Sequence, residues 1–211
     1  ILFNPESIAR AIERFDRARE DTDCLPTIQE LHQANGVWYN YDFHSSLSHI
    51  DADIALSQMS EAVRRGAEAL ASANVVIITF GTAFVYRLHE SGEVVANCHK
   101  QPQRLFSREM LSAEDIVQRY NALLQGPLAD KRVIFTLSPV RHLGDGLEQN
   151  SLSKATLRVA IAEIVAKNNN ANYFPSYEIM MDELRDYRFY ADDMAHPSTL
   201  AVEYIWERFM Q

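Results

Sequence analysis

Two apolar, β-branched runs constrain the fold of this chain more than any other feature. The first, "VVIITFG", covers residues 75–81 and stops at a glycine. The second, "RVIFTLSP", covers residues 132–139 and stops at a proline. Short continuous apolar runs are typical of strands buried on both faces of a parallel sheet. We therefore expect two central parallel strands with helices packed on either side of them.

Helix signals precede the first of these strands. Asn4 and Pro5 have the order of an N-cap followed by the first helical residue, and the apolar positions after them form one face. Residues 51–73 are predicted to form a long helix. Its expected core positions are Ile54, Met59, Val63 and Leu70.

Turns and further helices complete the pattern. Asn35-Gly36 and Ser91-Gly92 predict two hairpins, and "NYFPSYEI" predicts a short strand that leads into a helix. Three more helices are expected: around residues 116–124 behind a capping box at Ser112 and Asp115, from Ser153 to about Lys167, and after His196. Strands that alternate with helices indicate the α/β class, with a mostly parallel sheet. A length of 211 residues suits a single domain over residues 1–211.

Composition excludes several partners. The net charge is −9 and no basic stripe is present, which argues against binding to nucleic acid or an anionic membrane. The longest apolar run is far too short to span a bilayer. Cys24 and Cys98 are too few for a disulfide framework, so a cytoplasmic location is expected. We expect no cofactor.

Three polar clusters follow predicted strands or precede the last helix. Gly81-Thr82 follows the first buried strand, Ser138 to His142 follows the second, and Asp193 and His196 lie before the last helix. Ligands of open α/β sheets bind outside the carboxyl ends of the strands. Residues far apart in the sequence are therefore expected to meet at one edge of the sheet.

Asp193 and His196 have the spacing of a carboxylate that orients an imidazole. Held at Nδ1, the ring of His196 would keep Nε2 free as a base. The alternative is structural: Asp193 or Asp192 caps the last helix, Pro197 lies in its first turn, and His196 is a surface residue.

Other residues suit the binding of an oxyanion or a substrate. The N–H of Gly81 and the side-chain amide of Asn97 are possible oxyanion donors, although both residue types also occur in ordinary turns. Arg141 and His142 could line a cleft or bind a carboxylate, or be a solvated strand end. His44, with His49 and Asp51, could hold a metal, but H-x4-H-x-D matches no established ligand pattern, and we expect no metal.

Several stretches together resemble the GSCFA-domain family of the SGNH-hydrolase-like superfamily. They are "GTAFVY", "VANCHKQP", "SPVRH", "YFPSYEIMMDELRDYRFYADDMAHPS" and "EYIWERF". The resemblance implies a three-layer α/β/α sandwich of the flavodoxin-like kind with an ester-directed active site. It also implies that Asp193 and His196 belong to a catalytic triad.

Two departures from the family pattern affect this expectation. The resemblance places the nucleophilic serine in a GSCFA motif ahead of a segment like "ILFNPESI", so we expect the serine upstream of Ile1. The wider superfamily has an oxyanion-hole asparagine where this chain has Ala83, and Asn97 is expected to substitute for it.

The favoured hypothesis is a serine-dependent esterase, acyl hydrolase or acyltransferase that acts on an O-acyl ester of a small molecule or glycan. In it, His44, Arg141 and His142 line the substrate pocket. The alternatives are a non-catalytic carbohydrate-binding module on the same fold, suggested by Ala83, and a metal-dependent hydrolase that uses His44, His49 and Asp51.

Overall fold

The computed structural model describes residues 2–19 and 24–211 and has a mixed α/β architecture. Its helices are α1 (Pro5–Arg17), α2 (Ala52–Ser72), α3 (Ala113–Gln125), α4 (Gly146–Lys167), α5 (Ser176–Glu178) and α6 (Thr199–Phe209). A π-helical turn, Ile179–Glu183, continues α5. The strands are β1 (His32–Ala34), β2 (Val37–Tyr39), β3 (Val75–Phe80), β4 (Phe84–Leu88), β5 (Val94–Val95), β6 (Phe106–Met110), β7 (Arg132–Leu137) and β8 (Ala171–Phe174).

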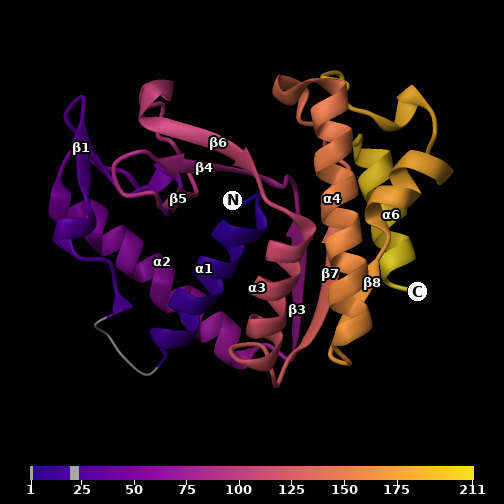
Figure 1. The fold of residues 1–211 in the computed structure, drawn as a ribbon, viewed down its shortest axis with the longest axis horizontal. Coiled ribbons are helices and arrows are strands. Elements are labelled where there is room, and N and C mark those ends of the chain that lie inside the picture. The colour runs from indigo at the N-terminus through magenta and orange to yellow at the C-terminus, as the bar shows by residue number, and fades with distance from the viewer. Residues whose placement is uncertain (1, 20–23) are drawn as a thin grey trace.

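A parallel sheet with the strand order β3-β7-β8 lies at the centre of the fold. Phe80 at the end of β3 pairs with Leu137 at the end of β7, so the two strands end side by side. The other strands form the β1-β2 hairpin and a small antiparallel sheet of order β5-β4-β6. Figure 1 shows the antiparallel sheet above α1 and α3 in this view, with the helices of the C-terminal part to the right.

Helices cover the parallel sheet on both sides, which confirms the expected α/β/α layering. The larger core joins β3 and β7 to α1, α3 and α4. A smaller cluster joins Phe174 of β8 to Ala201 of α6 and to residues of the π-helical turn.

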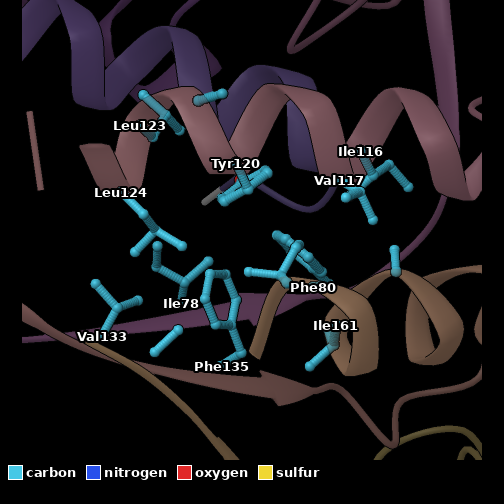
Figure 2. Packing of buried hydrophobic residues seen from close by; sticks show 14 of the residues in the cluster. Ile78, Phe80, Ile116, Val117, Tyr120, Leu123, Leu124, Val133, Phe135 and Ile161 are labelled. Atoms are coloured by element: carbon cyan, nitrogen blue, oxygen red, sulfur yellow. The ribbon is translucent and has the colours of Figure 1, made fainter. Parts of the chain in front are cut away.

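Three aromatic rings form the centre of the larger core. Phe80, Tyr120 and Phe135 pack with ring centroids 4.9 to 5.7 Å apart, and all three are fully buried (Figure 2). The hydroxyl of Tyr120 donates a hydrogen bond of 2.9 Å to the carbonyl oxygen of Pro5. The polar atom of this ring therefore fixes the start of α1 against α3.

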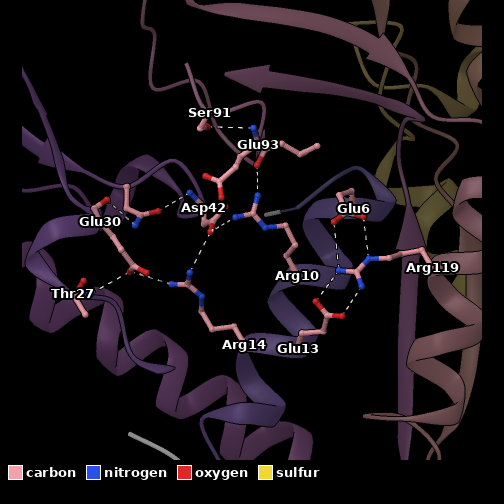
Figure 3. Close-up of polar contacts among 12 residues, drawn as sticks. Glu6, Arg10, Glu13, Arg14, Thr27, Glu30, Asp42, Ser91, Glu93 and Arg119 are labelled. Carbon is pink, nitrogen blue, oxygen red and sulfur yellow. Dashed lines mark hydrogen bonds and ion pairs between the residues drawn. The ribbon is translucent and has the colours of Figure 1, made fainter. Parts of the chain in front are cut away.

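Charged side chains also attach α1 to its neighbours. Arg119 of α3 pairs with Glu6 and Glu13 of α1, as Figure 3 shows. On another face of α1, Arg10 and Arg14 both pair with Asp42. These contacts place α1 between α3 and the segment that follows β2.

Local sequence signals are confirmed where short-range chemistry decides the backbone. The side chain of Asn4 caps α1, and Ser112 and Asp115 form the expected capping box at α3. Asn35 and Gly36 both have positive φ angles, 51° and 75°, as a two-residue hairpin turn requires.

Three expectations about burial and boundaries are wrong. Val75 and Ile77 are 45% and 51% exposed, because β3 is an edge strand and α6 packs near β8 on that face. Ile54 is 43% exposed, since in the first turn of α2 it is the neighbouring Ala55 that is fully buried in the core. The last helix, α6, is capped by Ser198 and not by Asp192 or Asp193, so Pro197 precedes the helix.

No helix within residues 2–19 and 24–211 is long and apolar enough to cross a membrane.

We expect Tyr120→Phe to lower the free energy of unfolding by about 1 kcal/mol, because the ring packing remains while one buried hydrogen bond is lost. Chemical denaturation monitored by circular dichroism measures the change. Tyr187→Phe, at a ring that is largely exposed, is the matched control and should change nothing. Equal stabilities of the two variants would contradict the role given to the Tyr120–Pro5 bond.

Candidate functional site

Asp193 and His196 form a hydrogen-bonded pair in the loop before α6. Oδ2 of Asp193 lies 2.6 Å from Nδ1 of His196. Oδ1 of Asp193 accepts the backbone N–H groups of Ala195 and His196, each at 2.9 Å. These bonds, chiefly the backbone N–H of His196, lower the pKa of Asp193 to about 2. The carboxylate is therefore ionised at any physiological pH and holds one side of the imidazole.

The backbone of this loop is bent so that the pair can form. Met194 has a positive φ of 58°, a conformation that costs a non-glycine residue free energy and is often found at functional sites. The side chain of His196 is 61% exposed, and no described residue bonds its Nε2. The imidazole therefore has the geometry of an oriented base with one free nitrogen.

Arg141 holds the loop against the end of β7. Its backbone N–H donates to the carbonyl of Ala195, and its guanidinium donates to the carbonyl of Met194 and the hydroxyl of Tyr190. The guanidinium carbon also lies 4.1 Å from the centroid of the Tyr190 ring. In this arrangement Arg141 supports the segment that carries His196, which is a different use from the substrate contact expected from the sequence.

Gly81 and His142 both contact Phe3. The N–H groups of Gly81 and Thr82 both donate to the carbonyl oxygen of Phe3, at 2.7 and 3.1 Å. The ring of Phe3 packs edge-on against that of His142, with centroids 6.4 Å apart. The two backbone donors thus already bind one oxygen, in the way an oxyanion hole binds a reacting carbonyl.

Asn97 and His44 line one cavity of about 260 Å³, together with Phe3. The remaining lining residues are Leu2, Phe43, Ser45 and Ala96. Oδ1 of Asn97 accepts the backbone N–H of His99, which leaves its NH₂ group as the available donor. The cavity therefore places a possible oxyanion donor beside an imidazole.

The predicted residues form a connected series along the carboxyl edge of the parallel sheet. The Asp193–His196 loop bonds to Arg141, the next residue His142 contacts Phe3, and Phe3 borders both Gly81 and the cavity of Asn97. Within the described residues, no group of three or more His, Cys, Asp or Glu side chains gathers at metal-binding distance. His49 instead accepts the N–H of Asp51 through Nδ1, which gives no support to the metal-dependent hydrolase.

Lys154 lies at the centre of this edge and was not predicted from the sequence. Its side chain is 2% exposed, and its ammonium donates to the carbonyls of Gly81 and Ser138, at 2.6 and 2.7 Å. Burial lowers the pKa of Lys154 to about 8. The signal was present, because Lys154, Leu157 and Ile161 recur at helical spacing on the buried face of α4.

The same turn of α4 fixes the loop after β3. Oγ of Ser153 accepts the N–H of Ala83 at 2.8 Å and lies 3.3 Å from the hydroxyl of Thr82. Burial, followed by the nearby charge of Lys154, lowers the pKa of His142. A neutral imidazole at His142 is therefore favoured near neutral pH.

Fold and site together define a three-layer α/β protein with a carboxylate–imidazole pair at the carboxyl edge of its parallel sheet. Comparison with protein families matches the GSCFA family over residues 1–209, so the chain belongs to the GSCFA family. Neither the curated proteins nor the solved structures contain a match.

We expect the free energy of unfolding to rise with pH between about 8 and 10.5, relative to a Lys154→Met variant. In this window the unfolded chain binds more protons than the folded one, because the pKa of Lys154 is lowered only in the folded state. The difference between wild type and variant should change by about 1 to 3 kcal/mol across the window.

Denaturant unfolding at a series of pH values measures this difference. Lys167→Met, at a largely exposed lysine of the same helix, is the control and should show no such dependence. A wild-type curve parallel to that of Lys154→Met would show that Lys154 titrates normally.

Proposed function

We propose that the protein is a serine-dependent ester hydrolase or acyltransferase that acts on an O-acyl ester of a small molecule or glycan. The observation that carries the proposal is the Asp193–His196 pair, with its 2.6 Å bond at Nδ1 and its unbonded Nε2. Membership of the GSCFA family supports it through the resemblance described above.

In the proposed reaction, Nε2 of His196 takes the proton of a serine hydroxyl as the oxygen attacks the acyl carbonyl. The imidazolium then returns this proton to the leaving alcohol. Asp193 holds Nδ1–H, fixes the ring orientation and stabilises the cation. The nucleophile is the serine that the family resemblance implies upstream of Ile1. No described serine is hydrogen-bonded to His196.

Charge on the carbonyl oxygen would be stabilised by the NH₂ group of Asn97 and by the N–H of Gly81. The first group has no bond to a described residue. The second becomes available only when the Phe3 carbonyl moves away. His44 and His142 would line the substrate pocket, with Arg141 supporting the catalytic loop.

Non-catalytic carbohydrate binding is the second candidate, and one observation favours it. The N–H groups of Gly81 and Thr82 both donate to the carbonyl of Phe3, and Ala83 donates its own N–H to Ser153. A fold that keeps these donors occupied would retain the cleft without activating an ester.

We expect His196→Ala to slow labelling by a fluorophosphonate at least about 10³-fold in the protein that includes the upstream segment, and Asp193→Asn to slow it comparably. His89→Ala, at an exposed histidine outside the site, is the control and should label at the wild-type rate. The labelling is compared at pH 8, where the carboxylate of Asp193 is ionised because its pKa is about 2. Mass spectrometry of the labelled protein measures the rates.

Equal labelling of wild type and His196→Ala would exclude His196 as the base. Binding of a sugar, with neither labelling nor turnover of acetyl esters, would instead establish the second candidate.

A further inference from the structure

A second cavity, of about 200 Å³, lies between α1 and α2. Its wall is mainly apolar, with contributions from Ala11, Phe15, Leu47, Ala62 and Val63. It shares Leu2, Phe43, His44 and Ala96 with the cavity that contains Asn97. The two cavities are therefore neighbours, and the second extends from the candidate site toward the interior of the α1–α2 layer.

Two polar groups on this wall lack a hydrogen-bond partner among the described residues. Ser7 is only 5% exposed, and its Oγ is buried without a partner. Nη1 of Arg14 is also buried without a hydrogen bond to a described residue, although it lies 3.8 Å from Oε2 of Glu30 in an ion pair. A buried polar group without a partner costs about 1 to 3 kcal/mol, so such groups are rare unless something else supplies the bond.

Both groups can donate a hydrogen bond, so any further partner must supply a hydrogen-bond acceptor. The backbone N–H of Ser7 is already bonded to Asn4, and Nη2 of Arg14 is bonded to Asp42. What remains is the hydroxyl of Ser7, which has no acceptor oxygen, and the Nη1 group of Arg14, whose one acidic neighbour among its printed contacts is Glu30 at ion-pair distance. The nearby charges of Arg10 and Arg14 are balanced by Asp42 and Glu30, as the network in Figure 3 shows, so a neutral acceptor fits better than an anion.

Size and spacing limit the apolar part of the ligand. Ser7 and Arg14 lie on one side of α1, seven residues apart, and seven residues of helix correspond to about 10 Å. A cavity of about 150 Å³ binds benzene. The cavity beside α1 is somewhat larger, so a chain of about six to eight carbon atoms is the appropriate size.

We propose that this cavity binds the acyl group of the ester substrate, a neutral chain of about six to eight carbon atoms that carries a hydroxyl or keto oxygen. The ester end lies in the adjoining cavity at Asn97, and the chain oxygen accepts from Ser7 or Arg14. The inference rests on the proposed function for the identity of the ligand as an acyl group. The binding of an apolar chain with one oxygen can be tested without any turnover.

The test of binding uses 1-hexanol as the probe and the 211-residue chain. We expect saturable shifts of the backbone amide resonances of Ala11, Phe43 and Ala62 in NMR titrations. Ala62→Leu fills the cavity and should weaken binding at least tenfold. Ala69→Leu makes the same change on the exposed side of α2 and should bind as wild type does.

A second variant tests the hydrogen bond. Ser7→Ala should weaken the binding of 1-hexanol about fivefold without lowering the melting temperature, because the hydroxyl has no partner in the unliganded protein. A lowered melting temperature, with unchanged affinity, would show that Ser7 serves the fold alone and would overturn its role in the site.

Turnover then identifies the ligand as an acyl group. In the protein that includes the upstream segment, Ala62→Leu should lower kcat/KM for a 4-nitrophenyl hexanoate at least tenfold, whereas Ala69→Leu should leave it unchanged. Binding of 1-hexanol that Ala62→Leu abolishes, with no ester turnover, would support the cavity and contradict the proposed function. Absence of saturable binding, or equal binding by Ala62→Leu, would overturn the inference even in an active esterase.

Discussion

One buried ammonium group joins the two strand ends on which the candidate site is built. Lys154 of α4 donates to the carbonyl of Gly81, just after β3, and to the carbonyl of Ser138, just after β7. In the described structure, the hydrogen-bond partners of the Lys154 ammonium are backbone carbonyls and include no carboxylate. The dipoles of these carbonyls therefore compensate for the hydration that the ammonium loses on burial. Because a buried charge is costly to leave unpaired, the two strand ends are held at fixed positions relative to α4.

The start of α1 is tied to the same edge by backbone hydrogen bonds. Phe3 accepts from Gly81 and Thr82, and Tyr120 holds the carbonyl of Pro5 two residues later. A ligand carbonyl that takes the place of the Phe3 oxygen would therefore act on the entry to α1 as well as on the strand end. Ser7, at the wall of the apolar cavity, lies two residues beyond Pro5. The two cavities and the strand end thus share a single short segment of chain.

Local signals in the sequence predicted the elements well, because short-range bonds decide them. The Asn35-Gly36 turn and the caps at Asn4 and Ser112 follow from residues within four positions of one another. The exposed face of β3 could not be predicted in this way. An apolar run such as residues 75–80 is compatible with one or two buried faces, and only the position of β3 at the sheet edge decides between them.

The candidate site was predictable to a similar extent, for the same reason. The Asp193–His196 bond depends on a three-residue separation and could be expected from the sequence. The occupation of the Gly81 N–H by Phe3 spans most of the N-terminal half of the chain, and no sequence pattern reports it. Lys154 was recognisable only by asking which polar residue shares the buried face of α4 with Leu157 and Ile161.

Because His196 is exposed, the geometry of its loop says more about the role of the Asp193–His196 pair than the strength of their hydrogen bond does. An exposed polar contact of this kind contributes little to folding stability in water, so stability does not explain why Asp193 and His196 are held so closely. Met194 adopts a left-handed backbone conformation in this turn, and Ser198 caps α6. Asp193 is thereby freed from capping the helix, and its second oxygen is directed to the imidazole. Under the proposed function, a loop that holds one ring in this way is the arrangement expected of a base that must be in position before its substrate arrives.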